Sequence, residues 1–282
     1  MKKTIFVMAA IALMVSACDK IEPDADGNYT TYAGPKIEWS DTVNVEITNP
    51  KHNALVEKYT GPRCTNCPTA DEALDNLHHT LGDRLVTVAI THYEEAPLLG
   101  LDTRTNEGEQ WGRYFGITFR PTAMLNRTNG DGQWDLFTGT SAISAMSSDV
   151  NAAIGQTPKV ALEATAARQA DSVQLTIDLE VLANLSVPLN VTVAITEDSL
   201  RYPQMTPNDI DEEYPHNHIL RKVITDIWGS TVTTSATAGK SYQGRVKFGL
   251  GSVSVPQNAH IVVFATDANT REVLNVTQCD ID

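Results

Sequence analysis

The sequence has few cysteines and few basic residues, and it has no long apolar run after residue 17. Only 4 of its 282 residues are cysteine, and 21 lysines and arginines stand against 35 aspartates and glutamates, for a formal net charge of −14 at pH 7. Such an acidic chain argues against nucleic acid as a partner and against direct electrostatic adhesion to anionic lipid. No segment after residue 17 is long and apolar enough to cross a membrane as a helix.

The N-terminus has the features of an exported bacterial protein. Two lysines precede an apolar stretch at 5–15 that is too short to span a bilayer, as in a secretory signal. Small residues at 16–17 stand directly before Cys18, a pattern that resembles a bacterial lipobox, in which the cysteine becomes the acylated first residue of the mature protein. We therefore expect residues 1–17 to be removed and Cys18 to carry a lipid anchor. The alternative is an ordinary signal peptide that leaves Cys18 as a thiol.

Composition and hydrophobic periodicity divide the rest of the chain into three parts. Residues 18–35 are polar, acidic and without apolar periodicity, which predicts a flexible tether. Residues 36–157 alternate strand-like and helix-like segments, which predicts an α/β domain. Residues 158–282 consist of alternating apolar and polar residues separated by turns, which predicts an all-β domain, an antiparallel sandwich of immunoglobulin-like type.

Individual elements can be predicted from their periodicity. In the α/β part we expect strands at 54–60, 84–93, 121–127 and 133–139, and helices at 68–81, 109–115 and 141–156. The last helix is expected to open at a serine cap. In the all-β part we expect strands at 159–166, 172–181, 188–198, 241–249, 259–267 and 272–279.

Cys64 and Cys67 lie three positions apart, between the predicted strand at 54–60 and the predicted helix at 68–81. A helix N-terminus favours a thiolate, and Cys-x-x-Cys in a βαβ context is typical of a thioredoxin-like redox site. A structural disulfide is an alternative, although a bridge over so short a loop stabilises little by chain entropy. A metal site would need four ligands, and apart from Cys18 the mature chain offers only Cys279 as a further cysteine. We expect no bound metal and no cofactor.

A second segment supports the redox interpretation. Residues 114–132, YFGITFRPTAMLNRTNGDG, resemble the thioredoxin segment that leads into a cis-proline, then an apolar strand and a turn. By this resemblance Pro121 is the cis-proline, and the backbone of the preceding residue faces the sulfurs and pairs with substrate. Glu57 resembles the buried acid that accepts the proton of the second cysteine in thioredoxins, although one extra residue separates it from Cys64.

The lipobox, EKYTGPRCTNCP at 57–68, the cis-proline segment and a β-rich half containing HNHILR at 216–221 together resemble one family. It comprises the thioredoxin-like outer-membrane lipoproteins of about twenty-eight kilodaltons from Gram-negative anaerobes. The resemblance implies a cell outer-membrane location, with a lipid anchor and a periplasmic or surface-facing body. Members are described as outer-membrane proteins of uncertain biochemical role, sometimes as adhesins or receptors, so the resemblance implies fold and location more firmly than activity.

Two arginines depart from the thioredoxin pattern. Arg120 stands before the proline, and Arg63 stands before the first cysteine. Close to Cys64, these cations would favour its thiolate and make the disulfide more oxidising. The alternative is that Arg120 points to solvent or pairs with an acid such as Glu57 or Asp131.

Two function classes remain open. In the first, Cys64 attacks disulfides of envelope proteins, Cys67 resolves the mixed disulfide, Glu57 relays its proton, and Pro121 with Arg120 shapes the peptide groove. In the second, the chain is a non-enzymatic surface lipoprotein whose β-domain binds a partner, and the two cysteines form a structural bridge.

Three further side chains are weaker candidates. His216 and His218 share a loop with several carboxylates and could hold a divalent metal, but two histidines alone more often form a solvated loop. Cys279 is expected to be a buried small apolar residue, with a resolving or inter-chain thiol as the alternative.

Overall fold

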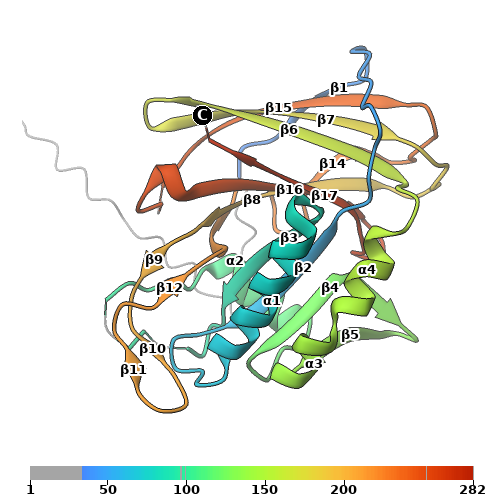
Figure 1. The fold of residues 1–282 in the computed structure, drawn as a ribbon. Helices are drawn as coiled ribbons and strands as arrows, with labels where there is room; N and C mark the ends of the chain where they lie inside the picture. The colour runs from blue at the N-terminus through green and yellow to red at the C-terminus, as the bar shows by residue number, and fades with distance from the viewer. Residues whose placement is uncertain (1–33, 96, 99, 252, 282) are drawn as a thin grey trace, which may run out of the picture. The chain divides into compact units, whose positions relative to one another are not determined.

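A computed structural model describes residues 34–282, apart from 96, 99, 252 and 282. The predicted signal peptide, Cys18 and nearly all of the predicted tether lie outside the described residues. No helix within the described part of the chain is long and apolar enough to span a membrane. The described residues form a mixed α/β architecture with extensive sheets, which confirms the mixed fold class predicted from the sequence (Figure 1).

The first half of the chain contributes strands and helices in alternation. β2 pairs in parallel with β3 and antiparallel with β4, and β5 pairs antiparallel with β4. The strands are β2 (Ala54–Thr60), β3 (Leu85–Thr91), β4 (Thr122–Gly130) and β5 (Gln133–Thr138). The helices are α1 (Cys67–Leu81), α2 (Asn106–Tyr114), α3 (Thr140–Ala145) and α4 (Ser147–Ile154).

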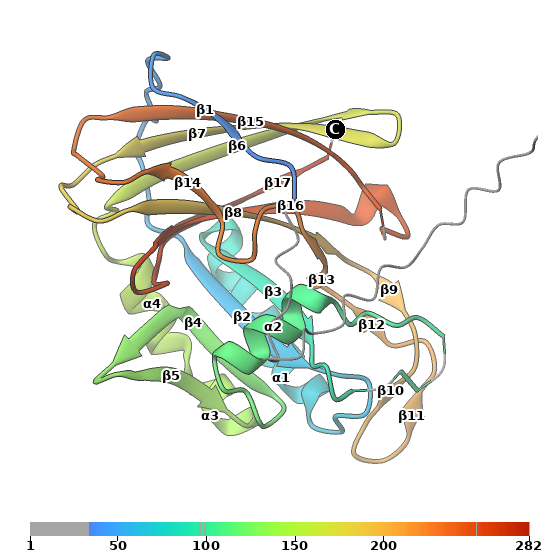
Figure 2. The ribbon, with the colours of Figure 1, turned by 180° about the vertical axis from the view of Figure 1, so that it is seen from behind.

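Both faces of β2 are buried, against different helices. Because side chains alternate along a strand, Ala54 and Val56 pack in one apolar cluster with residues of α1, α3 and α4. Leu55 and Tyr59 point the other way and pack with Trp111 of α2. α1 and α3 are accordingly seen in front of the strands in Figure 1, and α2 is in front in the reverse view of Figure 2. The same alternation determines which side chains of β2 face α1, the helix that begins at Cys67.

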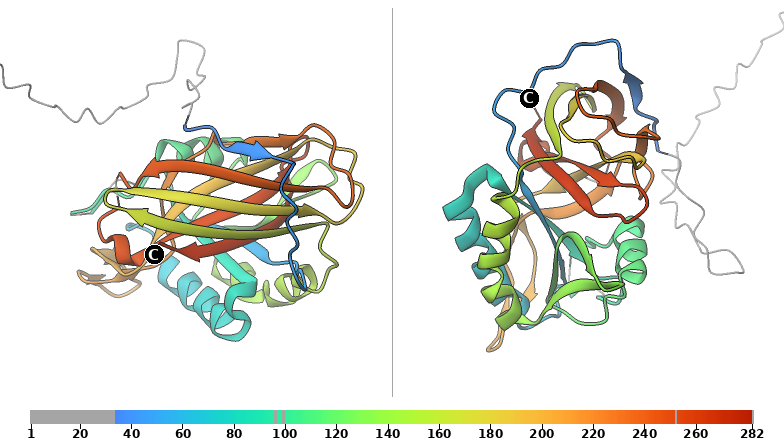
Figure 3. Two further views of the ribbon diagram at one scale, coloured as in Figure 1. Left: turned by 90° about the horizontal axis from the view of Figure 1, so that it is seen from above. Right: turned by 90° about the vertical axis from the view of Figure 1, so that its right-hand side faces the viewer.

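The regular elements of the second half of the chain are strands, apart from one short 3-10 helix at Pro256–Asn258. A 4-stranded sheet has the order β1-β15-β7-β6, and it packs on β8, β16 and β17 through a core of mostly branched aliphatic side chains (Figure 3). The strands are β6 (Val160–Gln169), β7 (Ser172–Val181), β8 (Leu189–Glu197), β14 (Ser230–Thr233), β15 (Ser241–Gly249), β16 (Ala259–Asp267) and β17 (Val273–Asp280). Along β7 every second residue is buried, as the alternating sequence predicts.

Two strands cross the boundary predicted at residue 157. β1 (Glu38–Ser40) pairs with β15, so these early residues belong to the 4-stranded sheet. β13 (Ile219–Val223) lies between β8 and β3, and one 9-stranded sheet runs from β17 to β5. Residues 36–157 and 158–282 therefore do not form two separate sheets. Their behaviour as folding units stays a prediction, and the shared sheet makes us expect one cooperative transition.

Four short strands connect β8 to β13. They are β9 (Leu200–Arg201), β10 (Gln204–Met205), β11 (Ile210–Asp211) and β12 (Pro215–His216). β10 pairs with β11 and β12 pairs with β9. In Figure 1 the β10–β11 hairpin lies beside the end of α1 where the cysteines are.

The helix predicted at 141–156 differs from the structure. It is divided into α3 and α4 at Met146, and α3 begins after Gly139 without a side-chain cap from serine. Gly139 has φ of 85°, a left-handed conformation that glycine adopts without a steric penalty. The backbone turn, not a hydroxyl cap, therefore sets the start of this helix.

Candidate functional site

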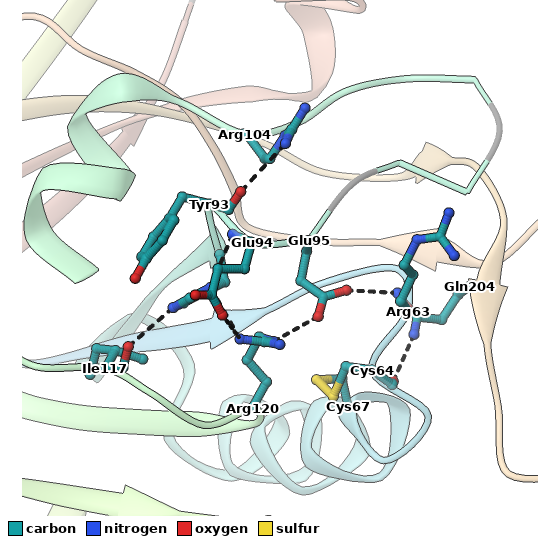
Figure 4. A network of polar contacts seen from close by, with 11 residues as sticks. Arg63, Cys64, Cys67, Tyr93, Glu94, Glu95, Arg104, Ile117, Arg120 and Gln204 are labelled. Carbon is teal, nitrogen blue, oxygen red and sulfur yellow. Dashed lines mark hydrogen bonds and ion pairs between the residues drawn. A yellow bond between two sulfur atoms is a disulfide. The ribbon is translucent and has the colours of Figure 1, made fainter. Parts of the chain in front are cut away.

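Cys64 and Cys67 are joined by a disulfide at the N-terminus of α1 (Figure 4). The Cys64 N–H donates to the Gly61 carbonyl at 3.0 Å, and the Cys67 N–H donates to the Cys64 carbonyl at 3.1 Å, so two successive turns carry the chain into the helix. No acidic residue lies in the first turn of α1 to offset its positive end. Cys64 is 9% exposed and Cys67 is fully buried, which makes Cys64 the more accessible cysteine of the pair.

The peptide bond between Arg120 and Pro121 is cis, as the resemblance to thioredoxins implies. The Arg120 guanidinium reaches neither Glu57 nor Asp131. Its Nε donates to Glu95 Oε1 at 2.7 Å, and its Nη1 lies 3.7 Å from Glu94 Oε2 (Figure 4). The charge of Arg120 is therefore compensated by an acid on another loop, Glu95, which agrees with the alternative that Arg120 pairs with an acid, although the acid is neither Glu57 nor Asp131.

Glu95 connects the proline loop to the cysteine loop. Its side chain is 7% exposed, and its second oxygen, Oε2, accepts a hydrogen bond from the backbone N–H of Arg63 at 3.1 Å. The side chain lies against Gly61, where any Cβ would collide with it. Glu95 was not predicted as a site residue because it lies 32 residues from Arg63 in the sequence. The sequence feature that could have indicated Glu95 is the acidic pair Glu94–Glu95, which directly follows the strand predicted at 84–93.

His92 supports the same network from the end of β3. Its Nδ1 accepts from Arg120 Nη1 at 3.1 Å and from the Glu94 N–H at 3.3 Å, so Nε2 carries the proton and donates to the Ile117 carbonyl at 3.1 Å. Burial lowers the pKa of His92 below its usual value. The neutral imidazole therefore acts as a fixed acceptor for Arg120.

A segment from the second half of the chain covers the cysteine loop. The buried Gln204 side chain donates through Nε2 to the Cys64 carbonyl at 2.9 Å (Figure 4). The Met205 N–H donates to the Pro62 carbonyl at 2.8 Å. These bonds satisfy backbone carbonyls that a loop would otherwise present to solvent. The β10–β11 hairpin therefore forms one wall of the disulfide site.

Glu57 does not reach the cysteines, which corrects the role expected for it as proton acceptor. Glu57 lies on the same face of β2 as Leu55 and Tyr59, since alternate residues of a strand share a face. It therefore points to the side of the sheet opposite α1. There both of its oxygens accept from Arg127, each at 2.7 Å. The residue that faces α1 is the next one, Lys58, because a shift of one position along a strand moves a side chain to the other face.

Among the described residues, no three histidine, cysteine or acidic side chains gather as a metal site would require. His216 is buried and stacks on Tyr202 with ring centroids 3.5 Å apart. His218 stacks on His78 instead. The two histidines of the predicted loop therefore serve packing. Cys279 is half-buried on β17 and packs against the core between the two sheets.

Replacing Glu95 with glutamine is expected to make the Cys64–Cys67 disulfide more oxidising. The amide keeps the shape but removes the closer of the two carboxylates that compensate Arg120, so more of its positive charge acts on the site and stabilises the reduced thiolate form. We expect a rise in reduction potential on the order of 30 mV, equivalent to about 1.4 kcal/mol, in equilibration with glutathione.

The matched control for this substitution is Glu94→Gln, because Glu94 is 59% exposed and lies farther from the guanidinium. It is expected to change the potential by less than about a third of that amount, since exposed ion pairs contribute little. An unchanged or lower potential in Glu95→Gln would show that the Arg120 charge does not act on the sulfurs.

Comparisons with known proteins place the chain in a family. The family model of outer membrane protein Omp28 matches residues 108–282, more than half of the chain. The chain belongs to the Omp28 outer membrane protein family, and its predicted outer-membrane location is confirmed. No curated protein sequence is significantly similar to it.

Solved structures show similarity in fold at low sequence identity. HBP35 of Porphyromonas gingivalis superposes with a TM-score of 0.64 at 19% identity, over 83% of this chain and 76% of HBP35. A protein of Agrobacterium tumefaciens gives 0.53 at 17% identity, over 83% of this chain and 97% of that protein. A domain of the outer membrane lipoprotein Omp28 from Porphyromonas gingivalis covers 45% of this chain and 91% of that domain at 24% identity, and its TM-score of 0.32 supports no structural argument.

Proposed function

We propose that this member of the Omp28 family carries out thiol–disulfide exchange on envelope proteins through Cys64 and Cys67. The observation that carries the proposal is the disulfide at the N-terminus of α1, in which the first cysteine is the more exposed residue. The positive end of the helix favours the thiolate that such chemistry requires. The cis bond before Pro121 adds support, because the resemblance to thioredoxins assigns that bond to the substrate groove.

A thioredoxin-like fold for the first half is part of the proposal. It is supported by the order of elements from β2 to α4, with β2 parallel to β3 and antiparallel to β4, and by the similarity in fold to HBP35. In this assignment the β-rich second half is a partner domain that contributes β13 to the shared sheet and β10 to the wall of the site.

The proposed reaction needs two steps. The Cys64 thiolate attacks a substrate disulfide, a new S–S bond forms between Cys64 and the substrate, and the second substrate sulfur leaves as a thiolate. Cys67 then attacks the Cys64 sulfur, the mixed disulfide breaks, and the substrate leaves fully reduced while the chain becomes oxidised. The reverse sequence oxidises a substrate dithiol. Arg120 and Glu95 would act as positioning residues for the loops on either side.

A non-enzymatic binding protein with a structural disulfide is the second candidate. It is favoured by the burial of both cysteine residues and by the hydrogen bond from Gln204 that fixes the Cys64 carbonyl. A structural bridge of this kind would hold the cysteine loop and the β10–β11 hairpin together without exchanging with other proteins.

Covalent trapping separates the two candidates. In cells, Cys67→Ser is expected to accumulate mixed disulfides with envelope proteins, because Cys64 still attacks while resolution is lost. The products are detected as high-mass bands that collapse on reduction. Cys64→Ser is the matched control and should trap none. Equal absence of such bands in both variants would favour the structural bridge.

We also propose that the mature chain is anchored by acylation of Cys18. The lipobox and the family's outer-membrane location support this anchor. Metabolic labelling with a radioactive fatty acid should mark the wild-type protein and not Cys18→Ala, and label that persists in the variant would exclude the anchor.

A further inference from the structure

An aromatic surface lies at the C-terminal end of α2 and has no part in the exchange chemistry. It consists of Tyr114 at the end of α2, Trp134 on β5 and Trp228 between β13 and β14. The centroid of the Tyr114 ring lies 4.5 Å from that of Trp228 and 6.0 Å from that of Trp134. Tyr114 is 50% exposed and both tryptophans are half-buried, so each of the three residues is accessible to solvent.

The aromatic surface is held in place from below and from the side. The buried Phe115 ring meets the Trp134 and Trp228 rings edge to face, an arrangement that aromatic pairs favour. The Trp228 N–H donates to Asp226 Oδ1, and the Trp228 carbonyl accepts from Asn190 Nδ2, each at 2.9 Å. These contacts keep the rings at the surface in a fixed arrangement, so little ordering is needed when a partner binds.

Two arginines lie at the edges of the aromatic surface. The central guanidinium carbon of Arg271 lies 4.8 Å from the centroid of the Trp228 ring. Arg113 directly precedes Tyr114, and its side chain is 50% exposed and pairs with Glu109. Tryptophan and tyrosine are enriched where a membrane meets water, and arginine forms charge-assisted hydrogen bonds to phosphate. This set of side chains suits the headgroup region of a phospholipid bilayer, although the chain as a whole is acidic.

The described chain begins close to the aromatic surface. Gly34, the first described residue, packs against the backbone of Ile224, where a Cβ at position 34 would collide with the Ile224 carbonyl. Ile224 precedes Trp228 by four residues, which limits the distance between their Cα atoms to at most about 14 Å. In the right-hand view of Figure 3, the first described residues and α2 lie on the same side of the molecule. The segment that leads to Cys18 therefore joins the body beside the aromatic surface.

We propose that the aromatic surface docks on the phospholipid surface of the membrane that holds the chain's own lipid anchor; the inference rests on the anchor proposed at Cys18. Cys18 and Gly34 are 16 positions apart, so the chain between them spans at most about 55 Å. A linkage of this length keeps the aromatic surface at an effective concentration on the order of millimolar beside the bilayer. Contacts that are weak in free solution are then enough to hold the surface on the membrane.

The test measures how deeply the tryptophans lie in a bilayer. The purified mature full-length protein is reconstituted in phosphatidylcholine vesicles, which are then collected by flotation. Part of the lipid carries a nitroxide that quenches tryptophan fluorescence, placed either near the headgroup or near the end of the acyl chain. Interfacial side chains lie about 5–10 Å into the boundary between headgroups and acyl chains. We therefore expect the nitroxide near the headgroup to quench at least about twofold more than the one near the chain end.

A substitution in the aromatic surface and a matched control then locate the contact. Tyr114→Asp is expected to lower the quenching by the headgroup nitroxide about threefold or more, because a carboxylate is unfavourable at membrane depth. Trp134 and Trp228 stay in this variant as reporters.

The control is Val255→Asp, which introduces the same charge at a side chain that is 43% exposed. The Val255 N–H donates to Glu197 at the end of β8, whereas Asn190, near the start of β8, bonds to Trp228. Seven positions of extended strand separate these two contacts by about 23 Å, so Val255→Asp should be quenched as the wild type is.

Quenching in Tyr114→Asp that equals the wild-type value would overturn the inference. A wild-type protein that floats with the vesicles but is not quenched would contradict the docking alone and leave the anchor in place. A wild-type protein that does not float would contradict the anchor, and the inference with it. Circular dichroism establishes that each variant is folded, and the wild-type depth comparison decides by itself if Tyr114→Asp is not. None of these outcomes changes the expected trapping by Cys67→Ser, which tests the exchange chemistry separately.

Discussion

Replacing Arg127 with methionine is expected to lower the free energy of unfolding by about 3–5 kcal/mol, the usual cost of breaking a buried ion pair by removing one partner. Arg127 is 1% exposed and donates two parallel hydrogen bonds to the Glu57 carboxylate. Methionine fills much of the same space, so the effect comes from the carboxylate that is left buried and unpaired. Urea denaturation at pH 7 measures the change.

Aromatic rings around the guanidinium connect the two halves of the chain. Arg127 lies over the rings of Trp111 and Phe115 near α2 and over Phe264 of β16, with 4.7, 5.1 and 4.9 Å from its central carbon to the ring centroids. Such contacts favour a cation, and more strongly when it is desolvated. The substitution should therefore weaken the packing of β16 against β2 and β4, and not only the pair itself.

A control and a double variant make this prediction specific. Arg113→Met removes an exposed partner of Glu109 and should change stability by less than about 1 kcal/mol. The double variant Glu57→Gln, Arg127→Met should be more stable than the sum of the single effects predicts, because no lone charge remains. Additive effects, or a loss below about 1 kcal/mol in Arg127→Met, would show that the pair is not a stabilising contact.

Acidification from pH 8 to pH 5 is expected to destabilise the protein by about 4 kcal/mol through two histidines alone. Burial lowers the pKa of His216 to about 3 and that of His218 to about 4, against an unfolded value of 6.5. The unfolded chain therefore binds more protons in this range, so stability is present above pH 6.5 and is lost as the pH falls toward 4. Each histidine contributes about 2 kcal/mol at pH 5, from the linkage of proton binding to folding.

One histidine acts in the opposite direction. Asp198 and Asp280 raise the pKa of His260, so its contribution is present below the unfolded pKa and is lost as the pH rises through the folded one. The net dependence of the free energy of unfolding on pH is measured by thermal or urea unfolding at a series of pH values. His218→Asn suits the φ of 59° at this position and should remove about 2 kcal/mol of the acid effect. If His218→Asn left the pH dependence of the free energy of unfolding unchanged, His218 would not be a source of the destabilisation by acid.

How far the sequence predicted the structure can be judged from particular residues. β2 and the strands at 172–181, 241–249 and 259–267 have the predicted ends, because apolar periodicity and turn residues define strands locally. The cysteine pair and the cis-proline were found because their signals are short and contiguous. Glu57 was misassigned because a one-residue offset, which is slight in sequence, moves a side chain to the opposite face of the sheet.

Other features depend on contacts between distant segments. Glu95 belongs to the site only because the loops after β2 and β3 and the loop before Pro121 meet. Gln204 contacts Cys64 from 140 residues away. β13 contains two basic residues among its five, and nothing in its sequence indicates that it pairs in parallel with β3. Such partners are set by the packing of the whole chain and not by local pattern.

The reduction potential of the Cys64–Cys67 pair is the measurement that tests the proposed exchange chemistry most directly. The purified full-length protein is equilibrated with glutathione or dithiothreitol buffers of defined potential, and the oxidised fraction is read by alkylation and mass spectrometry. We predict a potential between about −270 and −120 mV, the range of proteins that exchange disulfides. A value below about −300 mV would identify a structural bridge and contradict the oxidoreductase.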